Sequence, residues 1–472
     1  MTPGVVAAPP RVHRPAAAPE QPAPRRARWD GGDWPRTTRV LPWSIAAFVF
    51  MLFLIPFAGV KVPIELPIDA KLDRFAIGGL ALVWLAAVLS RPEHRPRHRS
   101  TLIDLAVGAF VLAAIASVLI GAERIAMADE LELAIKKLAL LLSFVGFFYI
   151  VATGLRPAEL GAFAIYIVAL SAVLAVGIVW EYRMRSNLFF EWTAKLLPPG
   201  FEIAQENPDP RWGRRSITGP TGHGLAASAV LAMALPYAVM LLIAAKKRSR
   251  RILYGLAIGL IMAAAMSTLR KTAVFAPATA LLVLSAYRPK AMVRLIPLGI
   301  VCVLVIQGLA PGALASISDQ IRPSKLSSAG TVKDRVADFD AVAPDVAAHP
   351  VIGRGYGTYD HNKYRLLDNQ YLGLRISVGY IGIAAYIAIF LSAVAIAHRL
   401  IRARRGFNSE VALAGSAACV VFGVGSALFD IMAFPHAPYV FLLSVALIAV
   451  AARGAATERM SARQGSPAVA RY

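Results

Sequence analysis

Repeated apolar runs of nearly membrane-spanning length constrain this chain more than any other feature. A bilayer core requires about 20 apolar residues per helix. Twelve runs approach or reach this length, and they cover residues 40–60, 74–89, 101–120, 138–152, 159–180, 224–245, 252–266, 273–287, 295–309, 376–397, 411–429 and 437–452. The sequence therefore predicts an all-α integral membrane protein with about twelve transmembrane helices.

Two of these runs admit two interpretations. Arg270 and Lys271 separate the run 252–266 from the run 273–287 without a proper loop. The segment 252–287 forms either two spans or one re-entrant hairpin, and we favour two spans.

Composition supports a membrane protein and argues against nucleic-acid binding. The chain is 57% hydrophobic and yet carries a formal charge of +22. Its lysines and arginines lie mainly between the apolar runs and do not form one basic face or arm, so we expect no nucleic-acid partner. Cys302 and Cys419 both lie within apolar runs, and they offer neither a disulfide framework nor a metal site. We expect no metal and no cofactor.

Basic loops alternate with loops that are poorer in cations. Lys and Arg concentrate in residues 1–39, 91–99, 246–251, 288–294, 398–405 and 453–472, whereas residues 430–436 contain none. Because basic loops face the cytoplasm, we expect both termini to be cytoplasmic. The predicted divisions are a disordered basic tail over residues 1–39, a membrane domain over residues 40–452 and a cytoplasmic tail over residues 453–472.

The same alternation places two long hydrophilic loops, residues 181–223 and 311–374, outside the cytoplasm. The second loop includes most of the densest polar stretch of the chain, residues 332–382. Residues 333–348 have the spacing of an amphipathic helix, which we expect to lie on the membrane surface. The glycines of 353–357 favour close approach of backbone N–H groups to an anion, and Arg354 among them is a candidate substrate-binding residue.

Three cations outside the basic loops have two interpretations each. Arg270 and Lys271 either anchor the chain at the lipid headgroups or clamp a lipid pyrophosphate, since guanidinium groups match phosphate oxygens. Arg335 either points towards the helix bundle or pairs with Asp338 one helical turn later.

Several motifs in the second half of the chain resemble the O-antigen ligase and lipid-linked polysaccharide polymerase family of bacterial envelope glycosyltransferases. They are HPVIGRGYGTY at 349–359, DNQYLGLRISVGYIG at 368–382, STLRKTAVFAP at 267–277 and RRSITGPTGHGLAASAVLAMALP at 214–236. The resemblance implies a polytopic α-helical fold with a large outer loop containing short helices. It also implies transfer of a glycan from undecaprenyl pyrophosphate to an acceptor sugar hydroxyl, at the outer face of a bacterial plasma membrane.

The resemblance also implies roles for individual residues. Arg270 and Arg335 match the family's donor-binding arginines. Lys271 and Arg354 are further candidate substrate-binding residues, on the evidence of their positions in the sequence. Asp368 stands where the ligases have an essential histidine, so either Asp368 or His361 is the expected general base. His223 is expected to line the acceptor site or to serve a structural role. The Asp368 difference favours a polymerase over a lipid A-core ligase.

Two functions of other classes remain as alternatives. A lipid-linked glycan flippase or exporter would be expected to place ionisable residues inside its spans, and the apolar runs contain almost none. A non-catalytic scaffold for envelope polysaccharide assembly is the other alternative. The partners expected for the enzyme are the lipid-linked glycan, an acceptor glycan or glycolipid, and membrane lipids.

Overall fold

The computed structural model describes residues 32–63, 71–90, 101–203, 216–321, 330–360, 363–403 and 406–463. The predicted disorder of residues 1–31 lies outside this part of the chain. Residues 32–39, predicted as part of the same tail, are placed against the bundle: Trp34 packs on Phe163, with ring centroids 4.6 Å apart, and Arg39 pairs with buried Glu159. The ordered chain therefore begins before the predicted boundary at residue 40.

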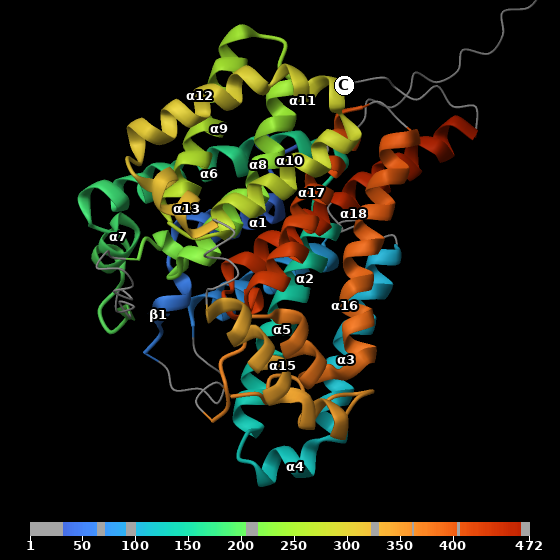
Figure 1. Cartoon of the computed structure of the whole chain (residues 1–472). Helices are drawn as coiled ribbons and strands as arrows, with labels where there is room; N and C mark the ends of the chain where they lie inside the picture. Colours follow the sequence, from blue (N-terminus) through green and yellow to red (C-terminus); the bar gives the residue numbers. More distant parts are fainter. Residues whose placement is uncertain are drawn as a thin grey trace, which may run out of the picture.

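The described chain is helical almost throughout (Figure 1). The helices of its first half are α1 (Val40–Leu54), η1 (Phe57–Gly59), α2 (Leu72–Leu89), α3 (Leu102–Ile120), α4 (Ala122–Met127), α5 (Leu131–Gly154), η2 (Pro157–Glu159), α6 (Leu160–Met184), α7 (Leu188–Leu196), η4 (Gly219–Thr221) and α8 (Gly224–Ala244). Those of the second half are α9 (Arg248–Ser267), α10 (Thr272–Tyr287), α11 (Pro289–Arg294), α12 (Ile296–Leu309), α13 (Ala313–Ile321), α15 (Gly330–Ala348), α16 (Gln370–Ala403), α17 (Phe407–Leu428), η5 (Ile431–Ala433) and α18 (His436–Arg463). The strands in this part of the chain are β1 (Val60–Lys61) and antiparallel β2 (Glu202–Ile203).

Nine helical segments in the described ranges are long and apolar enough to cross a membrane. Three shorter apolar helices, α1, α10 and α12, coincide with the remaining predicted runs. At about 1.5 Å per residue they are shorter than a bilayer core, so the count of twelve spans stays a prediction. The fold is consistent with an all-α multi-pass membrane protein. Because α18 continues to Arg463, the predicted domain end at residue 452 falls inside a helix.

Helix α8 forms the centre of the bundle. Its alanine-rich sequence is buried along nearly its whole length, and α6, α9, α10 and α17 pack around it. Small side chains allow such close helix approach. Peripheral helices instead expose large apolar side chains, such as Leu89 of α2, which is 76% exposed, and Leu119 of α3, which is 70% exposed. Such a surface suits contact with lipid.

At one end of the bundle, α4, α15 and the described residues of 349–369 form a polar lobe (Figure 1). The lobe is joined to α16 where that helix breaks at Gly379, whose φ is 60° and ψ is −163°. An unbroken helix would bond the N–H groups of residues 380 and 381 to the carbonyls of residues 376 and 377. Here Tyr380 N–H and Ile381 N–H donate instead to Pro350 O (2.9 Å) and Val351 O (3.2 Å).

The carbonyls released by this break are satisfied by the same segment of the lobe. Arg354 N–H donates to Ile376 O (2.8 Å), and Gly355 N–H donates to Ser377 O (3.0 Å). The lobe therefore supplies both the donors and the acceptors that the interrupted helix lacks, as a break near a membrane requires.

This exchange predicts that Gly379→Ala destabilises the protein. An added Cβ would lie 2.4 Å from Val351 C and O, and the positive φ strains any L side chain. We expect the free energy of unfolding to fall by about 2–4 kcal/mol, measured as a lower Tm in detergent. Gly373→Ala in the same helix is the control, since a Cβ there has nothing within 4 Å. Equal Tm values for the two variants would contradict the proposed constraint.

Candidate functional site

Arg270 and Lys271 lie in the short break between α9 and α10. Leu269 adopts a φ of 55°, which turns the chain sharply before the two cations. Thr272 Oγ1 hydrogen-bonds Ser228 Oγ at 2.7 Å, so the start of α10 is held against the first turns of α8. Arg270 donates from Nη2 to Ser216 Oγ at 3.2 Å. The side chain of Lys271 is half-buried and, within the described chain, makes no ion pair.

His223 precedes α8 and caps its first turn. Its Nδ1 accepts from Leu225 N–H at 3.3 Å, and its ring stacks on Phe434 with centroids 4.7 Å apart. Arg270 lies directly beside this turn, because a Cβ built on Gly224 would be 3.4 Å from Arg270 Nε. The structure thus brings His223 and Arg270 together, with His223 in a capping and stacking role.

The start of α16 joins the same region through η5 and Phe434. Gln370 Oε1 accepts from Met432 N–H at 3.0 Å, two residues before the ring that stacks on His223. Asn369 caps α16 by accepting from Tyr371 N–H at 3.0 Å. Asp368 precedes this cap and is exposed. We call His223, Arg270, Lys271, Asp368 and Gln370, which lie at three separate helix starts, the α8–α16 site. Contacts link Gln370 to η5, Phe434 to His223 and Arg270 to the α8 turn, whereas Asp368 forms no ion pair with either cation in the described part of the chain.

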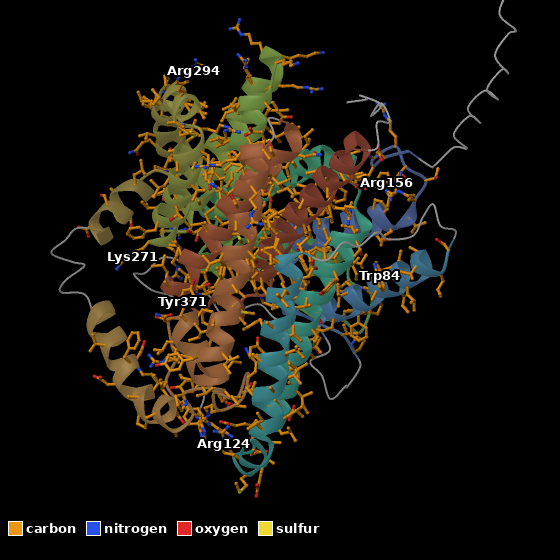
Figure 2. The ribbon with its side chains drawn as sticks, turned by 90° about the vertical axis from the view of Figure 1, so that its right-hand side faces the viewer. Trp84, Arg124, Arg156, Lys271, Arg294 and Tyr371 are labelled. Carbon is orange, nitrogen blue, oxygen red and sulfur yellow. The ribbon has the colours of Figure 1, made fainter. Side chains whose placement is uncertain are left out.

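Figure 2 shows where this site lies along the bundle. Lys271 and Tyr371 are both found between Arg294, near one end of the molecule, and Arg124, at the opposite end. Helices α8, α10, α16 and α18 all begin in this region, so the positive ends of their dipoles meet there. Glu181, near the end of α6, is a carboxylate of this region, and it accepts a hydrogen bond from Gly219 N–H at 2.8 Å. Asp430 at the start of η5 and the exposed Asp368 are further carboxylates of this region. An anionic ligand would bind there at the two cations and the helix starts.

Arg354 does not belong to the α8–α16 site. It is 7% exposed and forms ion pairs with Glu130 (3.1 Å) and Asp345 (3.3 Å). Its Nη2 donates to Tyr364 Oη at 2.8 Å, and its backbone carbonyl accepts from Arg124 at the far end of the molecule. Burial lowers the pKa of Arg354, but the tyrosine hydrogen bond and the two carboxylates outweigh burial and leave that pKa raised. These contacts give Arg354 a structural role, and its predicted role in substrate binding stays a prediction.

The glycine-rich turn at residues 353–357 packs against neighbouring helices and, contrary to the prediction, does not present its N–H groups to an anion. The N–H groups of residues 353, 354, 355 and 358 donate to backbone carbonyls, and Tyr356 N–H donates to Ser117 Oγ at 3.0 Å. The glycines instead permit close packing: a Cβ on Gly353 would lie 2.4 Å from Ser377 C, and one on Gly357 would lie 2.5 Å from Lys137 Cβ. The turn locks the lobe to α3, α5 and α16.

Helix α15 packs on the start of α16 through some of its apolar residues and exposes others. Val342 is buried with Leu367, Leu372 and Ile376, whereas Val336 and Phe339 are about half exposed. Buried Asp338 pairs with Arg365. Arg335 lies in α15, but its side chain is outside the described part of the chain, and so is the whole of His361. Their predicted roles therefore stay predictions.

Another imidazole lies in the polar lobe. Burial lowers the pKa of His349, and Arg124 and Arg354 lower it further against the opposing effect of Asp345. Among the residues that the structure describes, no cluster of His, Cys, Asp and Glu is arranged to hold a metal ion.

Sequence reasoning missed the residues that connect the α8–α16 site. Met432, Phe434 and Gln370 carry no local signal, because their partners lie far away in the chain. Glu130, 224 residues from Arg354, likewise carries no local signal of its partner. Searches against known protein families and against curated proteins find no match for this chain.

The buried Arg354 pair predicts a large loss of stability in Arg354→Ala. Removing one partner leaves Glu130 charged and 2% exposed, at an expected cost of about 3–5 kcal/mol. Adding Glu130→Gln should recover a measurable part of the lost Tm, because the isolated charge is then removed. Chemical denaturation of the single and double variants measures the coupling. A single variant as stable as the parent chain would show that the pair is not structural.

Proposed function

We propose that this chain is a membrane glycosyltransferase of the O-antigen ligase or polymerase type. It would transfer or polymerise a glycan from undecaprenyl pyrophosphate to an acceptor sugar hydroxyl at the outer face of a bacterial plasma membrane. The Asp368 difference from the ligases favours the polymerase form. This proposal includes the twelve-span topology with both termini in the cytoplasm.

One observation carries the proposal: two adjacent cations lie in a helix break beside the start of α8, in the same region as the start of α16. Arg270 contacts the α8 turn, and Lys271 makes no ion pair in the described ranges. A pyrophosphate carries the charge that such a group of cations and helix starts would stabilise. The apolar exposed flanks of the bundle suit the polyprenyl chain that bears it.

The proposed chemistry is a direct displacement. Arg270, Lys271 and Arg335 would bind the pyrophosphate oxygens and neutralise the charge that develops as the bond between the anomeric carbon and the pyrophosphate breaks. Asp368 or His361 would take the proton of the acceptor hydroxyl as its oxygen forms the new bond to that carbon. Attack from the opposite face inverts the anomeric configuration, and the carrier pyrophosphate leaves with the bonding electrons.

Arg270→Ala should lower glycan transfer by about 100-fold or more, because removing a fixed charge from the leaving group costs transition-state stabilisation. The assay uses the purified full chain in liposomes with a lipid-linked oligosaccharide donor, and it follows product length on gels. Arg294→Ala is the control, since Arg294 lies away from Lys271, near one end of the molecule (Figure 2). Arg270→Lys should retain an intermediate rate.

Two results would contradict the enzyme assignment. Normal transfer by a correctly inserted Arg270→Ala variant would favour a scaffold. Donor translocation by the parent chain, without any new glycosidic bond, would favour a flippase or exporter.

Asp368→Asn and His361→Gln distinguish the two candidate bases. The variant that removes the base should lower kcat by about 100- to 10,000-fold, while the other should change it by less than tenfold. Both rates are measured at saturating donor, with Asp368→Glu as the charge-conserving control. Unchanged kcat in both variants would remove both residues from the proposed mechanism.

A further inference from the structure

A second polar feature lies away from the α8–α16 site, at the opposite ends of α10 and α16. An open cavity of about 710 Å³ is lined there by residues of both helices and the turns that follow them: Ala286, Tyr287, Arg288, His398, Ile401, Arg402 and Ala403. Both helices pack against α17, whose first turn lies close by. The cavity belongs to the face with the basic segments 288–294 and 398–405, which the charge pattern predicts to be cytoplasmic.

The polar lining of the cavity is only partly satisfied. Arg288 is held by Glu410 of α17, with a second contact from Nε to Oε2 at 3.4 Å. Tyr287 Oη and His398 Nδ1 share a hydrogen bond of 2.9 Å. In the described part of the chain, neither His398 Nε2 nor the Arg402 guanidinium has a partner. Arg288 and Arg402 both line the cavity, and Glu410 pairs with Arg288, so the site is cationic and retains groups that can hydrogen-bond a ligand.

Apolar residues continue from the cavity along the same two helices. Leu282 precedes Ala286 by one helical turn, and it is 72% exposed. Leu391 precedes His398 by two turns, and it is 64% exposed. Residues four and seven positions apart share a helix face, so both leucines lie on the faces of α10 and α16 that line the cavity, further from the helix ends.

We propose that this cavity binds the phosphodiester headgroup of an anionic membrane lipid, with Arg288 and Arg402 at the phosphate oxygens and the acyl chains along Leu282 and Leu391. Basic pockets between transmembrane helices on the cytoplasmic side suit such headgroups. The volume is in the range of small-molecule sites, and the apolar continuation distinguishes a lipid from free phosphate. The inference does not rest on the proposed glycan transfer.

Native mass spectrometry of the full chain in detergent tests this inference, with phosphatidylglycerol, phosphatidylcholine and inorganic phosphate as probes. We expect the parent chain to bind phosphatidylglycerol at least fivefold more tightly than phosphatidylcholine. Arg402→Gln should weaken phosphatidylglycerol binding about fivefold, since one surface cation is worth about that much. His398→Ala should weaken it as well.

Arg399→Gln is the matched control, because Arg399 is exposed on α16 but does not line the cavity. Its affinity for phosphatidylglycerol should stay within twofold of the parent value, and the Tm of each variant verifies folding. Equal binding of the two lipids, an equal loss in Arg399→Gln, or inorganic phosphate binding as tightly as phosphatidylglycerol would overturn the proposal.

Discussion

Backbone hydrogen bonding across the break in α16 is the constraint on which the polar end of this protein depends. A helix that breaks near lipid exposes N–H and C=O groups that water cannot satisfy. Here the segment from Pro350 to Gly355 exchanges hydrogen bonds with residues 376–381 on both sides of Gly379. Gly353 and Gly379 are required because the two backbones approach too closely for a Cβ. The exchange fixes the lobe against the first turns of α16, and this helix begins at Gln370 of the α8–α16 site.

Burial and partner choice separate two arginines that look alike in the sequence. Arg354 is enclosed, and Glu130 and Asp345 compensate its charge, so a second anion would have to displace a carboxylate. Arg270 lies at the edge of the bundle beside helix starts, and Lys271 next to it makes no ion pair in the described ranges. Added positive potential from helix dipoles is strongest within the first turn. Anion binding is therefore electrostatically favoured at the helix break and disfavoured inside the lobe.

Much of the architecture follows from the apolar runs, because length and hydropathy constrain a helix locally. Each of the twelve predicted runs coincides with a helix, and the break at Arg270 separates α9 from α10. The spacing of residues 333–348 predicts a helix, which α15 confirms. Only the tertiary packing shows that Val342 faces the protein, whereas Val336 and Phe339 are exposed. The prediction that the glycine-rich turn binds an anion was wrong, because its N–H groups are used within the protein. Anion binding and close backbone packing both require glycine, and only the position of the neighbouring backbone distinguishes the two. Contacts such as Gln370 with Met432 depend on the tertiary fold and have no sequence period.

The two cationic regions differ in the surroundings that would select a ligand. At the helix break, the cations adjoin the starts of α8 and α10, and the exposed Asp368 precedes the capped start of α16 in the same region. At the cavity formed by the ends of α10 and α16, the charge of Arg288 is compensated by Glu410, and exposed Leu282 and Leu391 lie on the same two helices. A carboxylate beside a phosphoryl site lowers the affinity for the phosphoryl group, so its presence is favourable only where it acts as a base. An apolar lining raises the affinity only for a ligand with acyl chains. The first arrangement therefore suits a reacting pyrophosphate, and the second suits a lipid that stays bound.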